Sequence, residues 1–283
     1  MPTILSCSDG SVYARSVYDH SAWAAKRLGA GVRVLHMIEQ HEQPTRLDVS
    51  GALGFDASAD LMNEMIALAE TQARVARAKA RAILDDAQHT LSKQGVGRID
   101  LEQRHGSLAD SIGELDAASD LVVIGKRGEH ADFAKLHLGS NLERVIRICT
   151  HPILIASRAF HPVERFLLAY DGSPSVLKAV DYVQDSPLFK GLTCHLLRTG
   201  RIDDKARYYL EETAGRLRDR GFQVVSHVIP GAPEEVIASV MREQDVHLLV
   251  MGAYGHSRFR EFIVGSTTSI LIRRVLVPVM VFR

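Results

Sequence analysis

The chain has 283 residues, 46% hydrophobic and 24% charged, with 34 basic and 34 acidic residues and a formal net charge of zero. This is the composition of a globular protein with a sizeable core, and the charge balance argues against attraction of the whole chain to nucleic acid or to a membrane. The three cysteines (Cys7, Cys149 and Cys194) are far apart in sequence, so we expect neither a disulfide framework nor a structural zinc site. With no signal-peptide pattern at the start and no run of 18 apolar residues, we expect a cytoplasmic protein.

Short apolar runs alternate with helical patterns through the first half of the chain. Strands are predicted at residues 3–7, 32–37, 98–103, 121–124 and 153–156, and helices include 13–28 and 108–117. The runs are rich in Val, Ile and Leu with little alternation, which is typical of strands covered on both faces.

The longest helical pattern covers residues 59–94. Its apolar stripe steps by three or four residues through Leu61, Met65, Leu68, Gln72, Val75, Lys79, Ile83, Ala87 and Leu91. The opposite face carries Arg74, Arg77 and Arg81. That face either docks a partner or is simply the solvated side of a long surface helix, and the second interpretation is favoured.

The second half repeats the alternation. Strands are predicted at 165–169, 192–197, 223–229, 248–251 and 279–282, and helices include 204–220 and 234–243. Such alternation predicts right-handed βαβ units, so we expect an α/β fold of two tandem doubly wound domains, each a five-stranded parallel sheet flanked by helices.

Three landmarks recur in the same order in both halves, which indicates a duplication. They are an apolar run ending in Asp-Gly-Ser (3–11 and 166–174), an apolar run ending in Gly-x-x-Gly (120–128 and 247–255), and a Gly-Ser followed by a helix, a Pro and a closing apolar run (136–157 and 262–282). We therefore predict domains at 1–158 and 164–283, joined near Pro162.

The second copy carries a pattern suited to a phosphate chain. Gly252-x-x-Gly255 is followed, after nine residues, by Gly265-Ser266-Thr267. Glycines let backbone N–H groups approach a ligand, and the start of a helix favours an anion. The alternative is that the glycines are turn residues and Ser266 is an N-cap.

Asp171 ends the first strand of the same copy. In a doubly wound sheet, ligands bind beyond the carboxyl ends of the strands where the strand order reverses, so Asp171 and Gly252 would face one crevice. The alternative is an ordinary turn-forming Asp in Asp-Gly-Ser.

This ordered set of motifs resembles the universal stress protein family, and two copies make the chain similar to a tandem member. The resemblance implies an adenine-nucleotide α-hydrolase-like fold that binds ATP (or AMP or ADP, with or without Mg²⁺). By that resemblance, adenosine would meet Asp171, Met251, Gly252 and a second-strand residue near Thr199, and the phosphates would meet Gly255, Gly265, Ser266 and Thr267.

The first copy departs from the pattern, because ten residues rather than nine separate its Gly-x-x-Gly from Gly-Ser. Glu129 and Asp132 also add negative charge, which Lys126, Arg127 and Lys135 could offset. Nucleotide binding is left open for this degenerate loop, whose candidate residues are Asp9, Gly125, Gly128, Gly139 and Ser140.

Three functions remain open. The first is a nucleotide-binding stress-response regulatory protein with little or no hydrolysis, since no Walker lysine and no nucleophile elbow occurs. The second is a slow ATP-cleaving enzyme of the adenine-nucleotide α-hydrolase type, although that family's SGGxDS-like loop is missing. The third is a scaffold that has lost nucleotide binding.

Assembly follows from the two closing strands. Each is the last of its series, so each is expected at a sheet edge that needs a partner. We predict antiparallel pairing of 153–157 with 279–282, which makes the chain an intramolecular pseudo-dimer, as family dimers imply. A further homodimer through the 59–94 helix is an additional interpretation.

Overall fold

The computed structural model describes residues 1–38, 55–126, 140–253 and 265–283. In the first half the elements are β1 (Thr3–Ser8), α1 (Ala14–Leu28), β2 (Gly31–Ile38), α2 (Phe55–Lys93), β3 (Ile99–His105), α3 (Leu108–Asp116), β4 (Leu121–Gly125), α4 (Ser140–Ile148) and β5 (Ile153–Ala156). In the second half they are β6 (Arg165–Ala169), α5 (Pro174–Asp185), the 3-10 helix η2 (Pro187–Phe189), β7 (Thr193–Gly200), α6 (Asp204–Asp219), β8 (Gln223–Pro230), α7 (Pro233–Glu243), β9 (Leu248–Gly252), α8 (Ser266–Arg274) and β10 (Val279–Phe282). All ten predicted strands are present, with ends within three residues of those expected.

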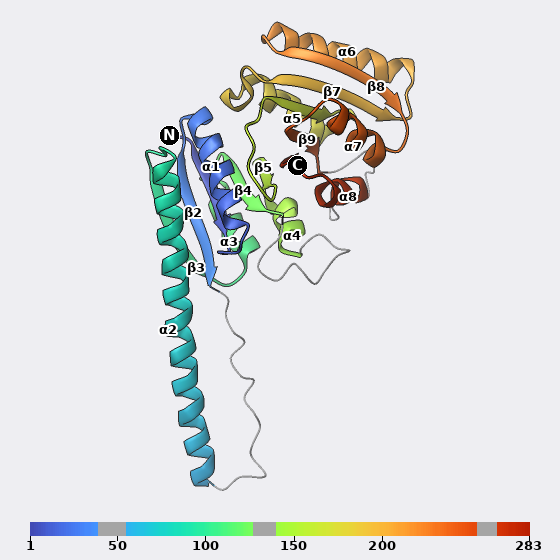
Figure 1. The fold of residues 1–283 in the computed structure, drawn as a ribbon. Coiled ribbons are helices and arrows are strands. Elements are labelled where there is room, and N and C mark those ends of the chain that lie inside the picture. Colours follow the sequence, from blue (N-terminus) through green and yellow to red (C-terminus); the bar gives the residue numbers. More distant parts are fainter. Residues whose placement is uncertain (39–54, 127–139, 254–264) are drawn as a thin grey trace.

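The strands form one continuous ten-stranded sheet in the order β3-β2-β1-β4-β5-β10-β9-β6-β7-β8 (Figure 1). Each half supplies five strands that pair in parallel, as the alternating pattern predicts. The two halves meet in the middle of the sheet, where β5 and β10 run antiparallel.

The β5–β10 seam confirms the predicted pairing of the closing strands. Leu154 lies opposite Met280 and Ile155 opposite Val279, and all four are buried. Because the seam is antiparallel, the carboxyl ends of the strands point to opposite edges of the sheet in the two halves. Any site at the carboxyl edge of one half therefore lies on the far side from its counterpart.

One apolar core covers each face of the sheet, and each core crosses the seam. The first core contains Tyr18 of α1, Leu91 of α2 and Leu210 of α6, together with Leu154 and Met280 from the seam. The second contains Ile112 of α3, Ile146 of α4 and Ile272 of α8, together with Ile155 and Val281. The two halves thus share both cores, rather than each holding a separate one.

A polar contact also joins the halves. The Arg27 guanidinium of α1 donates from Nε to the Leu188 carbonyl of η2 at 2.6 Å, and from Nη2 to the Lys190 carbonyl. These carbonyls lie at and just after a short helix, where a cation interacts favourably with the unpaired acceptors.

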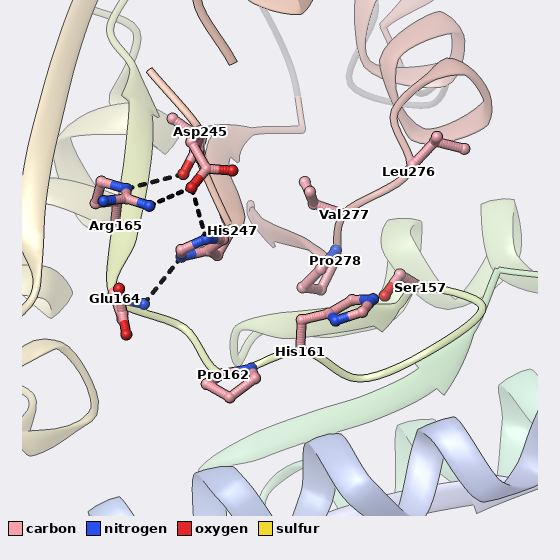
Figure 2. Close-up of a pocket in the computed structure, with 11 residues that line it drawn as sticks. Ser157, His161, Pro162, Glu164, Arg165, Asp245, His247, Leu276, Val277 and Pro278 are labelled. Atoms are coloured by element: carbon pink, nitrogen blue, oxygen red, sulfur yellow. Dashed lines mark hydrogen bonds and ion pairs between the residues drawn. The ribbon is translucent and has the colours of Figure 1, made fainter. Parts of the chain in front are cut away.

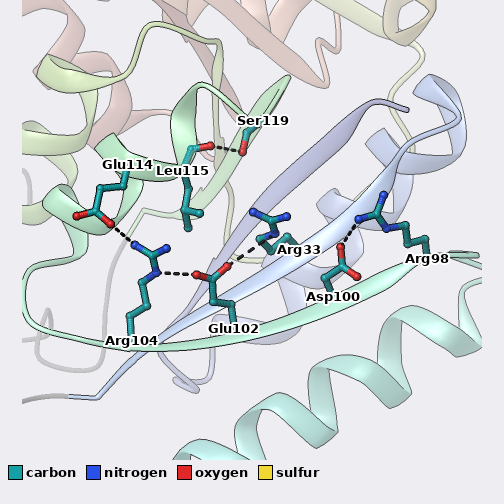
Figure 3. A network of polar contacts seen from close by, with 8 residues as sticks. All are labelled: Arg33, Arg98, Asp100, Glu102, Arg104, Glu114, Leu115 and Ser119. Carbon is teal, nitrogen blue, oxygen red and sulfur yellow. Dashed lines mark hydrogen bonds and ion pairs between the residues drawn. The ribbon is translucent and has the colours of Figure 1, made fainter.

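Charged side chains line β3, the edge strand of the first half (Figure 3). Arg98 pairs with Asp100 at 2.7 Å, while Arg104 bridges Glu102 at 2.6 Å and Glu114 of α3 at 2.5 Å. Such exposed and half-buried surface pairs add little to stability. Their effect is to make the edge a poor template for an added strand, because charges on an edge strand oppose pairing with another chain.

Helix α2 packs against the sheet along its C-terminal part. Among the side chains of α2 that the structure describes, the buried ones are Ala80, Leu84, Ala87, Thr90 and Leu91. Figure 1 shows the N-terminal part continuing well beyond the ends of β2 and β3. The long surface helix is therefore confirmed, but most of the predicted apolar stripe does not pack on the domain: Leu61, Leu68 and Val75 are exposed.

None of the helices in the described part of the chain combines the length and the apolar character that a membrane-spanning segment requires.

Candidate nucleotide site

The carboxyl edge of the second half brings together the predicted residues that the structure describes. Strand β6 lies between β9 and β7, with Leu168 opposite Val250 and Ala169 opposite Leu197. Asp171, Gly252 and Thr199 each come two residues beyond one of these paired positions. All three strands are parallel, so the three residues end at the same edge. The strand order also reverses here, because the chain leaves β6 toward β7 on one side and returns to β9 on the other.

Asp171 sits in a tight turn after β6. Its Oδ1 accepts a hydrogen bond from the Ser173 backbone N–H at 2.8 Å, and Gly172 has a φ of 77°. Ser173 then caps α5 by accepting from the Val176 N–H. The first half repeats the turn, with the Ser11 N–H donating to Asp9 Oδ1 at 2.9 Å. Both aspartates therefore stabilise turns, and any contact of either with a nucleotide would be in addition to this structural role.

Gly252 is required by the protein's own packing. A Cβ built on it would lie 2.4 Å from the Ser175 Oγ, 3.2 Å from the Ser175 Cβ and 3.3 Å from the Val176 backbone nitrogen. Helix α5 therefore begins directly against the end of β9. This close approach of helix to strand is enough to require a glycine at position 252 without any ligand. The sequence analysis had instead explained the glycine by the approach of a ligand.

The N-terminus of α8 is anchored to the end of β9. The Gly265 N–H donates to the Ala253 carbonyl at 3.2 Å, and the Thr268 hydroxyl donates to the Gly252 and Ala253 carbonyls, both at 3.3 Å. The sequence analysis named Gly265, Ser266 and Thr267 but not Thr268. The buried hydroxyl of Thr268 holds the start of α8 in place.

The first turn of α8 has the properties of an anion site. Gly265 occupies the N-cap position with no side-chain cap hydrogen bond, so the alternative that Ser266 is the N-cap is wrong. No acidic residue lies in the first turn, where Ser266 is exposed and Thr267 half-buried. The first amides of a helix have no partners within it, and together with the helix dipole they favour a negative group.

Met251 and Thr199 lie on the α7–α8 face of the sheet. Met251 is buried in the core of that face, while Thr199 is half-buried and its Oγ1 lies 3.5 Å from the Gly231 carbonyl. Further back on the same strand, His195 Nδ1 lies 3.0 Å from His227 Nε2. Burial lowers the pKa of both imidazoles, so this pair contributes no cation at neutral pH.

Arg198 is a further residue at this edge that the sequence did not single out. Its Nε is buried without a hydrogen-bond partner among the described residues. It precedes Thr199 on β7, so its side chain projects to the opposite, α5–α6 face of the sheet. The guanidinium therefore does not stand beside the first turn of α8.

Some predicted residues cannot be placed. Gly255 of the second loop, and Gly128 and Gly139 of the first, lie outside the described residues. Ser140 begins α4, as Ser266 begins α8.

The corresponding edge of the first half is arranged differently. Asp9 follows β1 and Gly125 ends β4, the neighbouring strand. However, Lys126, which we expected to offset negative charge near a phosphate, donates to the Val275 carbonyl at 2.5 Å and the Val277 carbonyl at 3.0 Å in the second half. Its ammonium group thus binds carbonyls at and beyond the end of α8.

Helix α2 also crowds the first half's turn. A Cβ built on Gly10 would lie 2.4 Å from the Ile83 Cδ1 of α2, whereas nothing lies within 4 Å of the corresponding position at Gly172. The turn after β1 is therefore partly covered and the turn after β6 is open.

A pocket of about 470 Å³ lies between the halves (Figure 2). It is lined by the joint around Pro162 and by residues that precede β6, β9 and β10, at the amino edge of the second half. Several of its polar groups are already engaged: Arg165 pairs with Asp245, and His247 Nδ1 accepts from the Glu164 backbone N–H at 3.2 Å. We do not assign the nucleotide to this pocket, because it holds no helix N-terminus and none of the predicted residues.

Comparison with known proteins agrees with this architecture. The model of the universal stress protein family matches residues 1–157 and again 162–283. Universal stress protein Slr1230 of Synechocystis is 34% identical over 287 residues, and the alignment covers all of both chains.

Solved structures share the fold over the whole chain. A universal stress protein from Archaeoglobus fulgidus aligns with a TM-score of 0.73 at 23% identity, covering 99% of this chain and 96% of that one. A putative universal stress protein from Pseudomonas aeruginosa aligns with a TM-score of 0.64 at 15% identity, covering 100% and 93%. The chain therefore belongs to the universal stress protein family and carries two copies of the family's domain in one polypeptide.

Proposed function

We propose that the chain is a stress-response regulatory protein that binds ATP, or a related adenine nucleotide, through its second domain. The observation that carries the proposal is the meeting of Asp171, Gly252 and the open first turn of α8 where the strand order reverses. Ligands of doubly wound sheets bind at such a point.

In this proposal each group has a defined part. The first-turn amides of α8, together with the Ser266 and Thr267 hydroxyls, hold phosphate oxygens. Asp171, half-buried at the end of β6, accepts a hydrogen bond from the ribose or from the adenine amine. Met251 and Thr199 border the adenosine, and Gly255 and Gly265 complete the loop. If Mg²⁺ accompanies the nucleotide, it would be held mainly by the phosphates, as this ion usually is.

We further propose that the domains span 1–158 and 164–283 and that the first contributes less to binding. Two contacts support the asymmetry. Lys126 is engaged by the carbonyls of Val275 and Val277, and Ile83 of α2 presses on the Gly10 turn. Asp9, Gly125, Gly128, Gly139 and Ser140 remain its candidate residues.

One observation favours a scaffold as the second candidate function. The Asp171 turn and the Gly252 approach both have complete explanations in packing and capping. A chain that had lost its ligand would keep both features. Titration of ATP into the protein separates the candidates, since only the nucleotide-binding protein gives heat from a saturable site.

ATP turnover should be undetectable or far below about 1 per second, the low end for kinases. The first turn of α8 offers Ser266, Thr267 and Thr268, hydroxyls without a general base or guanidinium among them. Efficient phosphoryl transfer needs such groups positioned around the phosphate. Release of phosphate, measured at saturating ATP and Mg²⁺, checks this. Turnover near 1 per second that disappears in Asp171→Ala would instead support an ATP-cleaving enzyme.

A further inference from the structure

The N-terminal part of α2 extends beyond the strands of the sheet that the structure describes (Figure 1). Between residues 61 and 79 no side chain of the helix is buried, and burial begins only at Ala80. At 1.5 Å per residue this unsupported part is roughly 28 Å long. Helices in proteins owe most of their stability to packing of an apolar face, so a bare helix of this length calls for a partner.

Residues 61–79 expose several large apolar side chains. Met62 is 56% exposed, Ile66 51%, Leu68 59% and Val75 61%. Met62 and Ile66 lie one turn apart on one face of the helix, and Leu68 and Val75 lie two turns apart on another face. Exposed apolar surface marks interaction sites on soluble proteins.

One stripe of the segment has the spacing of a two-helix seam. Met62, Ile66, Ala69, Ala73 and Ala76 follow one another at intervals of four, three, four and three residues. The stripe continues through Ala80 and Ala87, which pack on the sheet. The helix thus uses one face throughout, covered near the domain and uncovered beyond it.

Charge along the helix is divided between two halves. Residues 55–73 include four acidic residues and no basic one, and residues 74–82 include four basic residues and no acidic one. Two such helices side by side in parallel would place like charges together. Laid antiparallel, each acidic half meets a basic half.

The stripe is also self-complementary in the antiparallel arrangement. If a second copy is reversed about a point level with Thr71, Ile66 comes opposite Ala76 of the second copy and Ala69 opposite its Ala73. Ile66 then faces a small side chain, and the Ala69–Ala73 pair is small on both sides, which lets the two helices approach closely. We propose that the projecting part of α2 pairs antiparallel with the same segment of a second copy of this chain, making a homodimer centred near Thr71.

Sedimentation and light scattering test the partner. The full chain should have twice its monomer mass, and Ile66→Glu should raise the dimer dissociation constant by at least roughly tenfold, since it places a charge in the seam. Leu276→Glu is the matched control, because Leu276 is 91% exposed elsewhere on the surface, and it should stay dimeric. A monomeric full chain, or a dimer that Ile66→Glu leaves intact, overturns the proposal, as does a monomer that binds lipid vesicles through this segment.

Single cysteines test the orientation, and the three natural cysteines are all buried. In the antiparallel pair, the two copies of residue 69 are about 6 Å apart along the axis and the two copies of residue 62 about 27 Å apart. A short bis-maleimide should therefore join Ala69→Cys subunits efficiently and Met62→Cys subunits hardly at all. Equal cross-linking at both positions indicates a parallel pair and contradicts the proposal, and so does cross-linking at neither.

Discussion

Replacing Ser266 by Asp is expected to lower the affinity for ATP by roughly a hundredfold, the size of a close charge–charge repulsion at a partly solvated site. The substitution puts a carboxylate at the first residue of α8, where the proposal places phosphate. The helix itself should tolerate the change, because an acidic residue in the first turn interacts favourably with the helix dipole. Calorimetric titration with ATP measures the effect, and thermal denaturation checks that the fold survives.

The chain supplies its own control for this experiment. Ser140 begins α4 as Ser266 begins α8, and α4 already has Glu143 in its first turn. Ser140→Asp makes the same chemical change in the first domain and should leave ATP affinity within about twofold of the unmodified protein, well under 1.4 kcal/mol. If Ser140→Asp weakens binding and Ser266→Asp does not, the nucleotide belongs to the first domain.

Truncating Leu154 to Ala should lower the free energy of unfolding by about 2–5 kcal/mol, the usual cost of such a change in a packed core. Leu154 is completely buried on β5, opposite Met280 of β10. Both apolar cores cross this seam, so the two domains should unfold together. Calorimetry should show one transition at neutral pH, shifted as a whole to lower temperature by the substitution.

Leu276→Ala serves as the reference, because a 91% exposed side chain should change stability by less than about 0.5 kcal/mol. Two separate transitions, of which Leu154→Ala moves only one, would show that the domains are independent and merely abut at the seam.

The fold could be predicted from the sequence because its signals are local and repeated. Short runs of Val, Ile and Leu between helical patterns marked all ten strands, and the duplicated motifs fixed which strands correspond. The antiparallel seam was also predictable, since each closing strand would otherwise have left an apolar edge unpaired.

The site was predictable only in outline. Strand ends and a helix start put Asp171, Gly252 and Ser266 at one edge, because parallel strands end together. What the sequence could not reveal is which atoms come close across the chain. The Ser175 hydroxyl against Gly252 and the Thr268 hydroxyl on the carbonyls of β9 depend on the packing of α5 and α8.

The contacts between the two halves could likewise not be predicted from the sequence. From the sequence, Lys126 could offset the negative charge near the first loop, yet it donates to carbonyls about 150 residues away in the chain. The exposure of the N-terminal part of α2 could not be predicted either, because it too depends on packing between distant segments. The spacing of apolar residues is the same along the whole helix, and the extent of the sheet decides which of these residues are covered.

The stoichiometry of ATP binding to the unmodified protein, measured by calorimetric titration after removal of any co-purified nucleotide, tests the central claim most directly. We predict one ATP per chain, because the second domain has an open turn at Asp171 and an uncapped helix start at Gly265. In the first domain Lys126 is bound to carbonyls of the second half, and Ile83 covers the turn at Gly10. Absence of any saturable heat of binding would contradict the account and leave the chain as a scaffold that has kept the fold without the ligand.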